Sequence, residues 1–470
     1  MALRAPPGLK RSALPLGLLA LGAAAAAYAA AGYPGLTAIP GWFYRPTHPG
    51  LGFTTWAAAG GALALASFTF VWRARRAGVA VALLTLGSVA LQAAALGSSA
   101  DGLEKFWTRL YGGHGEFLAV AHRESDALSV LQTYDARVER DELGHFPPSK
   151  PPGALAFYFA LDRLGERVAS LPLQRELVRR ARATRARGHA AGAALALWLL
   201  PLLTALLAPL ALALARAMGA RHGQARLAGI LTATTPTVLL ISHHLDGALY
   251  PLVGTAAMAA VVQAAQTRSS ARRLVLGLAG GTLFALGLYT SFSLLPLGVA
   301  TLAALGLRWR AARRDARPFH GVEGVAWAAL AFVATAALLM VFLRFDPQRR
   351  FLGAMAYHRE WKAGVPTTLW RAVAPLEFAL WLGAPLLFTV FGGALGGARD
   401  GRGVGVWALG MLAITTAVSG TNEVARLWIF LVPLFAVAAA MARRWAAEEA
   451  AALVVAQLAV AVALGAAGPW

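Results

Sequence analysis

The chain has 470 residues, of which 58% are hydrophobic and only 14% are charged. A soluble domain usually carries about 25% charged residues, so this composition excludes an ordinary soluble protein. The net charge is +21, but the arginines lie in short segments between apolar runs, where they orient a membrane protein, so we expect no nucleic-acid partner. The absence of cysteine excludes a disulfide framework and thiolate chemistry.

Apolar runs long enough to cross about 30 Å of hydrocarbon recur along the chain. The first follows Arg4, Lys10 and Arg11 and resembles a signal peptide, but many more runs follow, so we expect a retained helix. The predicted fold is all-α, a polytopic membrane protein with about thirteen transmembrane helices. The predicted spans are about 13–32, 52–72, 77–97, 190–215, 227–243, 247–266, 273–289, 291–307, 321–343, 376–397, 403–420, 427–442 and 449–467.

Basic residues fall in one alternating set of the loops between these spans. The other short loops hold only Arg45 and Arg426. Under the positive-inside rule the basic side is cytoplasmic, which puts the N-terminus in the cytoplasm and loops 98–189 and 344–375 outside it. The abundance of Ala, Gly and Arg is typical of a GC-rich bacterial genome, so we expect a bacterial cytoplasmic (inner) membrane protein.

The first outer loop, 98–189, shows signs of helical structure. Residues 117–131 have helix-like apolar spacing, and Ala154 to Leu164 is apolar but too short to span, which predicts a helix lying in the interface. Gln174 to Arg187 is a basic amphipathic segment. It is either a helix solvated among lipid headgroups or a site that captures a phosphate-bearing lipid, because the same electrostatics serve both.

This loop also holds two candidate sites. Asp101 stands at the outer end of the third span, where a carboxylate either takes a proton from a bound hydroxyl or simply faces water. The segment from His145 to Gly153 contains four prolines and is therefore stiff. It either holds His145 and Lys150 as an anion site or is only a rigid turn before a helix.

Further charged groups lie at other predicted outer helix ends. His243, His244 and Asp246 either bind a metal, although no third firm ligand is close in sequence, or are ordinary interfacial residues at a span end. Glu377 begins a predicted span, and a carboxylate near hydrocarbon is costly unless it is paired or faces a cavity. Glu423 and Arg426 are three residues apart and share a helix face, either as a structural ion pair or as a phosphate-binding arginine with its orienting carboxylate.

Together these motifs resemble the GT-C superfamily of membrane glycosyltransferases, and more closely bacterial relatives of the protein O-mannosyltransferase and aminoarabinose transferase group. The matching pieces are Lys150-Pro-Pro-Gly153, His243-His-Leu-Asp246, Tyr289-Thr-Ser, the stretch from His358 to Gly383 with Glu377, and Ser419 to Trp428. The resemblance covers most of the chain from about residue 77, so we expect two extra helices over 1–76 and a catalytic unit over 77–470.

The resemblance implies an inverting transfer of a sugar from a polyprenyl-phosphate-linked donor to a lipid, glycan or protein acceptor, on the extracytoplasmic face. Asp101 takes the place of the catalytic base, and Glu104 and Glu116 are its rivals because Gly102, rather than an acid, follows Asp101. Lys150, Arg426 or the basic segment would hold the phosphate charge. The implied substrate-binding residues are His145, Lys150, His243, Asp246, His358, Glu377, Glu423 and Arg426. No cofactor is expected, and the sequence leaves a divalent metal open without indicating one.

Two other classes of protein stay open. A transporter or flippase of a lipid-linked saccharide should carry ionisable residues near the middle of its spans and show repeat symmetry. This chain instead carries its acids in predicted outer loops and at outer helix ends, which favours chemistry at the membrane surface. The third alternative is a non-catalytic envelope assembly protein.

Overall fold

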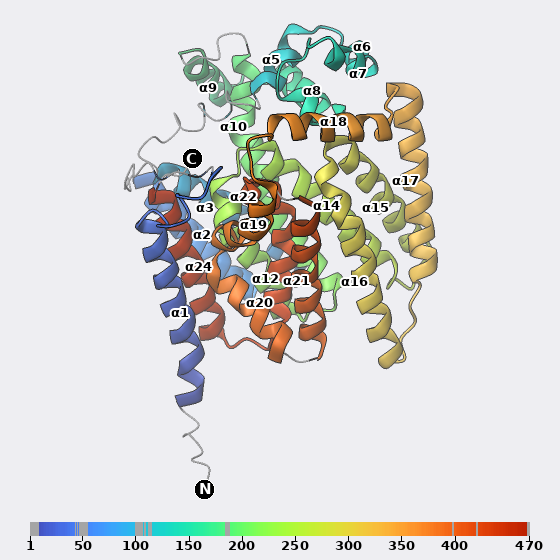
Figure 1. Ribbon diagram of the computed structural model, residues 1–470. Coiled ribbons are helices and arrows are strands. Elements are labelled where there is room, and N and C mark those ends of the chain that lie inside the picture. Colours follow the sequence, from blue (N-terminus) through green and yellow to red (C-terminus); the bar gives the residue numbers. More distant parts are fainter. Residues whose placement is uncertain are drawn as a thin grey trace. The chain divides into compact units, whose positions relative to one another are not determined.

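The computed structural model describes residues 9–42, 44, 46, 55–98, 107, 110, 115–183, 189–396, 399–419 and 422–467. Within these residues every regular element is a helix, and no strand occurs (Figure 1). Helices satisfy their own backbone hydrogen bonds, which is what hydrocarbon demands of a spanning segment. The predicted all-α class is confirmed.

Nine helices of the described residues are long and apolar enough to cross a bilayer. They are Ala13–Ala30, Ala77–Gly97, Ala190–Ala217, Leu245–Ala264, Ser270–Thr290, Phe292–Arg314, Gly321–Leu343, Gly401–Ser419 and Ala447–Ala467. A bent pair of helices would make a tenth span, and Ala57–Arg73 and Ile429–Met441 are apolar but shorter. The chain is therefore a multi-pass protein embedded in a membrane.

The chain divides into two compact units, each assembled from separate stretches of sequence. Unit 1 comprises Met1–Asp101, Ala205–Ile241 and Val365–Trp470. Its helices are α1 Leu9–Ala30, α2 Thr55–Arg73, α3 Ala77–Gly97, α11 Leu207–Ala217, α12 His222–Thr234, α13 Pro236–Leu240, α19 Thr367–Leu382, α20 Ala384–Gly396, α21 Arg399–Ser419, α22 Val424–Leu427, η3 Ile429–Leu431, α23 Val432–Met441 and α24 Ala447–Ala467.

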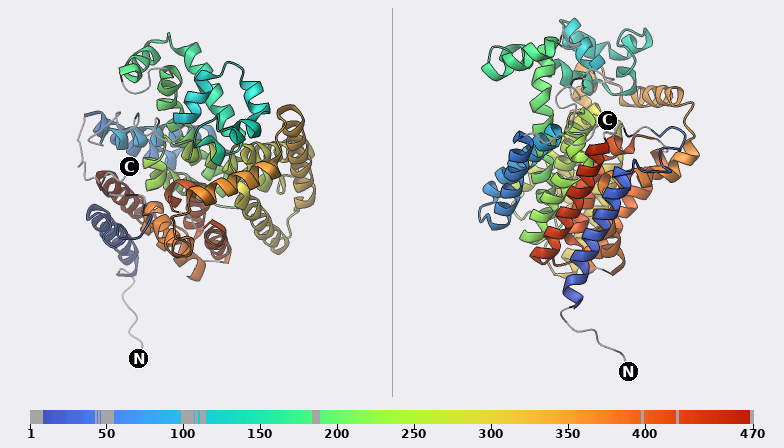
Figure 2. Two further views of the ribbon diagram at one scale, coloured as in Figure 1. Left: turned by 45° about the horizontal axis from the view of Figure 1, so that its top comes forward. Right: turned by 90° about the vertical axis from the view of Figure 1, so that its left-hand side faces the viewer.

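Large aromatic side chains form part of the core of unit 1. Helices α1 and α24 lie side by side in both figures, although they come from opposite ends of the chain (Figures 1 and 2). Beside them, Trp42 stacks on Trp370 with ring centroids 6.0 Å apart, and Tyr44 packs against Trp381 at 4.9 Å. These rings are all buried, so the segment after α1 is fastened to α19 by aromatic packing.

A sharp bend separates α19 from α20. The sequence predicts a single span over 376–397, but the two helices meet at an angle of 109°. Gly383 stands between them with φ +92°, a conformation that L side chains rarely adopt. A Cβ atom at this position would lie 2.1 Å from Gln457 Oε1, so the bend depends on glycine for space as well as for its backbone angle.

Unit 2 comprises Gly102–Thr204 and Ser242–Gly364. Its helices are α5 Gly115–Arg123, α6 Ala127–Gln132, α7 Tyr134–Glu139, η1 Pro147–Ser149, α8 Pro152–Val168, α9 Pro172–Ala183, α10 Ala190–Ala205, α14 Leu245–Ala264, α15 Ser270–Thr290, η2 Phe292–Leu294, α16 Leu295–Arg314, α17 Gly321–Leu343 and α18 Pro347–Trp361.

Long and short helices separate within unit 2. Helices α14, α15 and α17 pack side by side, and much of the apolar surface of α17 is exposed, as lipid contact requires (Figure 1). The short helices α5 to α8 gather at one end of this bundle, and α18 runs across the direction of the long helices there (Figures 1 and 2).

The predicted helical character of the first outer loop is confirmed by α5 to α9. Helix α8 covers the apolar stretch 154–164, and α9 covers most of the basic segment that starts at Gln174. The helix α18, in contrast, lies in a region that the sequence analysis treats only as a loop. Its N-terminus is well defined, because the Asp346 carboxylate accepts hydrogen bonds from the backbone N–H groups of Gln348 and Arg349.

Candidate functional site

The predicted anion site is a proline-rich segment, residues 145–153, that connects α7 to α8 in unit 2. Pro147 and Pro148 begin the short helix η1, and Pro152 begins α8. Proline suits these first positions because its missing N–H would have no intrahelical partner there. The segment is therefore rigid, and its buried prolines fix the direction in which Lys150 leaves the backbone.

Lys150 forms a largely buried ion pair with Asp246, at the N-terminal turn of α14. Lys150 Nζ donates a hydrogen bond to Asp246 Oδ1 over 2.9 Å, and the two side chains are only 14% and 3% exposed. The same ammonium lies 5.3 Å from the centre of the Tyr250 ring. Carboxylate and aromatic face together hold the lysine cation in one place. His243, half-buried, lies just before this turn, with its ring 5.1 Å from that of His244.

The segment also packs closely against the end of α15. A Cβ atom at Gly153 would lie 2.4 Å from the backbone oxygen of Tyr289, so only glycine fits at this contact. Lys150 and Gly153, Asp246, and Tyr289 belong to three separate motifs of the sequence. The fold of unit 2 brings these three motifs together.

Three side chains fix the backbone of the proline-rich segment. Glu116 Oε2 accepts a hydrogen bond of 2.7 Å from the N–H of Phe146, and Tyr134 Oη donates one of 2.6 Å to the carbonyl of Pro147. Arg350 of α18 donates to the carbonyl of Pro148 over 2.8 Å and to Asp135 Oδ1 over 3.0 Å. Backbone N–H and carbonyl groups away from water need such partners: Glu116 accepts from an N–H group, and Tyr134 and Arg350 donate to carbonyl groups.

His145 lies against an aromatic surface of α18. The hydroxyl oxygen of Tyr357 is 2.6 Å from both the Nδ1 atom and the carbonyl oxygen of His145. Because the hydroxyl carries one proton, it donates to the carbonyl and accepts from Nδ1–H when both contacts are hydrogen bonds. The Trp361 ring lies edge-on to His145 at 5.3 Å and stacks with the ring of His358 at 6.0 Å.

Burial keeps two tyrosines of this region protonated. It raises the pKa of Tyr158 in α8, and the negative charge of Asp246 raises it further. Burial likewise raises the pKa of Tyr134, against the opposing effect of the Arg350 cation. Both phenols therefore act as hydroxyl groups at neutral pH, and neither provides a base.

Unit 1 holds a second charged group, formed by Glu377, Glu423 and Arg426. Arg426 Nη2 lies 2.6 Å from Glu423 Oε2, so the predicted pair three residues apart is confirmed. Glu377 lies in the second half of α19 rather than at a helix start, and it is fully buried. Its Oε1 atom accepts a hydrogen bond of 3.1 Å from the backbone N–H of Ala425. The carboxylate thus fixes the segment that carries the Glu423–Arg426 pair.

Tyr44 lies close to this charged group and packs on Trp381. Burial raises the pKa of the Tyr44 hydroxyl first, and the charges of Glu377 and Glu423 raise it further, while Arg426 lowers it. The phenol therefore stays protonated beside two carboxylates.

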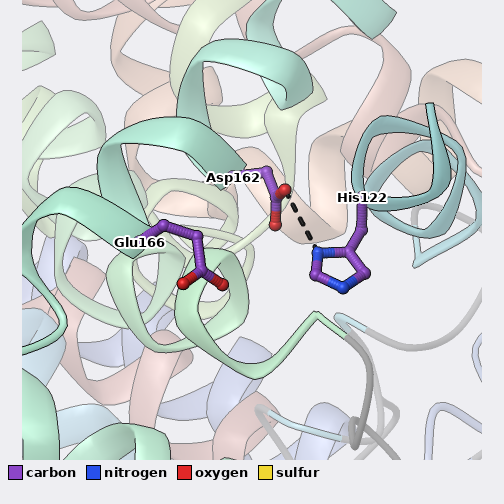
Figure 3. A group of neighbouring side chains, drawn as sticks. All are labelled: His122, Asp162 and Glu166. Carbon is purple, nitrogen blue, oxygen red and sulfur yellow. Dashed lines mark hydrogen bonds and ion pairs between the residues drawn. The ribbon is translucent and has the colours of Figure 1, made fainter. Parts of the chain in front are cut away.

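A third cluster lies in unit 2 and was not predicted from the sequence. His122 of α5 faces Asp162 and Glu166 of α8, with His122 Nδ1 3.3 Å from Asp162 Oδ2 (Figure 3). One ligand atom from each of these three side chains lies within 4.8 Å of the other two. In the described part of the chain, this is the group of histidine and carboxylate side chains close enough together to hold a metal ion.

The predicted site residues therefore fall into separate groups. One group is the proline-rich segment with its own His145 and Lys150 and with two residues that contact it, Glu116 and Asp246. The other group, in unit 1, consists of Glu377, Glu423 and Arg426. Asp101 and Glu104 lie outside the described residues. Sequence reasoning missed Tyr134, Asp135, Arg350 and Tyr357, because no local pattern marks a residue whose partner is far away in the chain.

The chain has no match among the known proteins with which it was compared. No family model matches the chain, and no curated protein or solved structure matches it.

Proposed function

We propose that the protein is a membrane-embedded glycosyltransferase of the GT-C type. It transfers a sugar from a polyprenyl-phosphate-linked donor to a hydroxyl of a lipid, glycan or protein acceptor. The donor lipid suits a multi-pass protein, because it lies in the same bilayer as the apolar helices.

One observation carries this proposal. Three motifs on which the family resemblance rests converge in unit 2, where Lys150 pairs with Asp246 and Gly153 packs on Tyr289. These motifs are far apart in the sequence, since Asp246 comes 96 positions after Lys150. A chance resemblance of unrelated segments gives no reason for them to meet in the fold.

The proposed reaction is a single displacement at the anomeric carbon. The acceptor oxygen forms the new bond to that carbon while the bond between the carbon and the phosphate oxygen breaks, which inverts the configuration. The acceptor proton goes to a carboxylate, and the lipid phosphate leaves with its negative charge. In the proposal Asp101 is this base, and Glu104 is its rival.

Glu116 is a weaker candidate for the base. Its carboxylate already accepts the N–H of Phe146, and its Oε2 atom lies close to Gly144. This hydrogen bond holds the Glu116 carboxylate in place. We assign Glu116 to positioning the proline-rich segment.

Lys150 is the proposed partner of the leaving phosphate. An ammonium has three donors, of which one goes to Asp246. Its rigid backbone and its carboxylate partner fix the cation before the donor binds, which is the arrangement that stabilises developing charge most effectively. Arg426 or the basic segment that starts at Gln174 are alternative phosphate ligands.

The proposal includes a topology. We place the N-terminus in the cytoplasm, the first outer loop outside a bacterial cytoplasmic membrane, and about thirteen spans between the termini. The two extra helices before residue 77 remain part of this proposal. Its support is the one-sided distribution of arginine in the sequence and the nine helices of the described residues that are long and apolar enough to cross a bilayer.

The test is transfer of a labelled sugar from a polyprenyl-phosphate donor by the purified protein in proteoliposomes. Wild type is compared with Asp101→Asn, Glu104→Gln and Glu116→Gln. We expect Asp101→Asn to lose transfer and the other two to keep it. Unchanged turnover in Asp101→Asn would refute Asp101 as the base, and no transfer by wild type from any such donor would refute the enzyme class.

One observation favours a transporter of a lipid-linked saccharide instead. The bent pair α19 and α20 is a broken helix with a buried carboxylate, Glu377, and such helices form substrate sites in transporters. The same proteoliposomes distinguish the two functions. A transporter moves the labelled lipid between leaflets without forming a new glycosidic bond, whereas the proposed enzyme forms that bond.

A further inference from the structure

Two helices of unit 2 present a histidine and two carboxylates to one point. His122 stands near the end of α5, and Asp162 and Glu166 lie one turn apart on α8, on the same helix face (Figure 3). One ligand atom from each residue lies within 4.8 Å of the others. No other part of the proposed function uses these side chains.

Asp162 is the least satisfied member of the cluster. It is only 6% exposed, and its Oδ1 atom has no hydrogen-bond partner among the residues that the structure describes. Its other oxygen reaches only the His122 ring, at 3.3 Å. Arg163, the next residue in the chain, donates a hydrogen bond to the carbonyl of Ser125. A buried carboxylate with so little compensation is costly unless a cation joins it.

The electrostatics of the cluster favour a cation. The carboxylates of Asp162 and Glu166 both lie close to the His122 ring. Two carboxylates thus share a single imidazole. Glu166 is exposed and His122 is partly exposed, so an ion can reach the cluster from solvent.

The distances fit a small divalent ion. Two ligand atoms that each lie about 2.1 Å from a tetrahedral ion are about 3.4 Å apart. His122 Nδ1 and Asp162 Oδ2 already have this separation. The ligand atom of Glu166, an exposed side chain, lies within 4.8 Å of the other two. A histidine nitrogen among the ligands favours zinc or a similar transition metal over calcium or magnesium.

We propose that His122, Asp162 and Glu166 bind one divalent transition-metal ion, with zinc as the best-fitting example. Water completes the tetrahedral shell. The ion connects α5 to α8. Because Glu116 of α5 accepts the N–H of Phe146 and α8 begins at Pro152, this connection joins two helices that both contact the proline-rich segment.

The test measures metal binding by the full-length, tag-free protein in detergent. After chelation and dialysis, zinc binding is followed by calorimetry and by elemental analysis, and Co²⁺ is used as a spectroscopic probe. We expect one zinc ion per chain, visible d–d absorption bands with Co²⁺, and a rise of about 3 °C or more in the thermal unfolding midpoint at saturating zinc.

The variants identify the ligands. His122→Ala and Glu166→Gln should each weaken zinc binding by at least about 100-fold and abolish the thermal shift. Glu166→Gln changes an exposed side chain and is the variant that folds most safely. His222→Ala, an exposed histidine of unit 1, should bind zinc like wild type.

Three outcomes would overturn the proposal. They are a stoichiometry of zero, retention of wild-type affinity in Glu166→Gln, and equal competition by Ca²⁺ for the bound ion. None of these measurements involves sugar transfer, so they test the metal site independently of the proposed enzyme activity.

Discussion

Lys150 Nζ and Asp246 Oδ1 lie 2.9 Å apart, in a pair that is almost closed to solvent. Lys150 comes from a stiff proline-rich segment and Asp246 from the first turn of a membrane-spanning helix. The negative side chain suits that position, because the N-terminus of a helix carries partial positive charge. The pair thus joins the proline-rich segment of unit 2 to helix α14 of the same unit.

Breaking this pair should destabilise the protein strongly. Lys150→Met leaves the buried Asp246 charge without its cation and should lower the free energy of unfolding by about 3 kcal/mol. The double variant Lys150→Met with Asp246→Asn should recover part of this loss, because the uncompensated charge is gone. Reversible unfolding in mixed micelles measures both values. Additive losses in the double variant would contradict a coupled pair.

Arg350 should contribute far more to stability than its neighbour Arg349. Arg350 is 3% exposed and serves both Asp135 and the carbonyl of Pro148, so Arg350→Met should cost about 2–4 kcal/mol of unfolding free energy. Arg349 pairs with Glu139 on the exposed side of the same helix, and Arg349→Met should stay close to wild type. Equal losses in the two variants would show that the buried contacts of Arg350 do not form.

Gly383 should tolerate no side chain. Gly383→Ala combines a strained positive φ with a clash against Gln457, and we expect a loss of about 2 kcal/mol or more in unfolding free energy. Gly392 of α20 is the matched control, because a Cβ atom there meets nothing within 4 Å. Gly392→Ala should be neutral or stabilising by up to about 1 kcal/mol. A neutral Gly383→Ala would contradict the bend.

Tyr134 predicts a pH dependence with a defined sign. Burial raises its pKa in the folded state above the ordinary value of 10.0, so the folded protein binds this proton more tightly than the unfolded chain does. The contribution of Tyr134 to stability is therefore complete below pH 10 and is lost as the pH rises toward the folded pKa.

Tyr134→Phe isolates that contribution. It removes the hydrogen bond to Pro147 and should lower the free energy of unfolding at pH 7 by about 1–2 kcal/mol. The difference between wild type and Tyr134→Phe should then shrink above pH 10. A difference that stays constant with pH would mean that the hydroxyl is not buried as described.

Local sequence patterns predicted the helices and one of the contacts. Apolar runs identified the nine helices of the described residues that are long enough to span a membrane, because a helix in hydrocarbon needs only length and composition. The pair Glu423–Arg426 was also predicted, although Glu423 precedes α22 with a left-handed φ of +65° instead of sharing a helix face with Arg426. The bend at Gly383 was not, because a single glycine in an apolar run gives no sign of a 109° turn.

Local sequence patterns do not predict contacts between distant segments. The sequence marks His145, Lys150 and Asp246 as candidate site residues, but their chemical types alone do not say which partner each one contacts. His122 lies 40 residues from Asp162, and only folding brings them together. The spacing of Asp162 and Glu166 was a visible signal, but two acids one turn apart are common on solvated helices.

The most direct test of the account is sugar transfer by the Lys150→Met, Asp246→Asn double variant. In proteoliposomes supplied with a labelled polyprenyl-phosphate sugar, wild type should form the glycosidic product. The double variant, folded but without the lysine cation, should lose at least about 100-fold in turnover. Transfer by the double variant at the wild-type rate, or no transfer by wild type from any such donor, would contradict the proposed function.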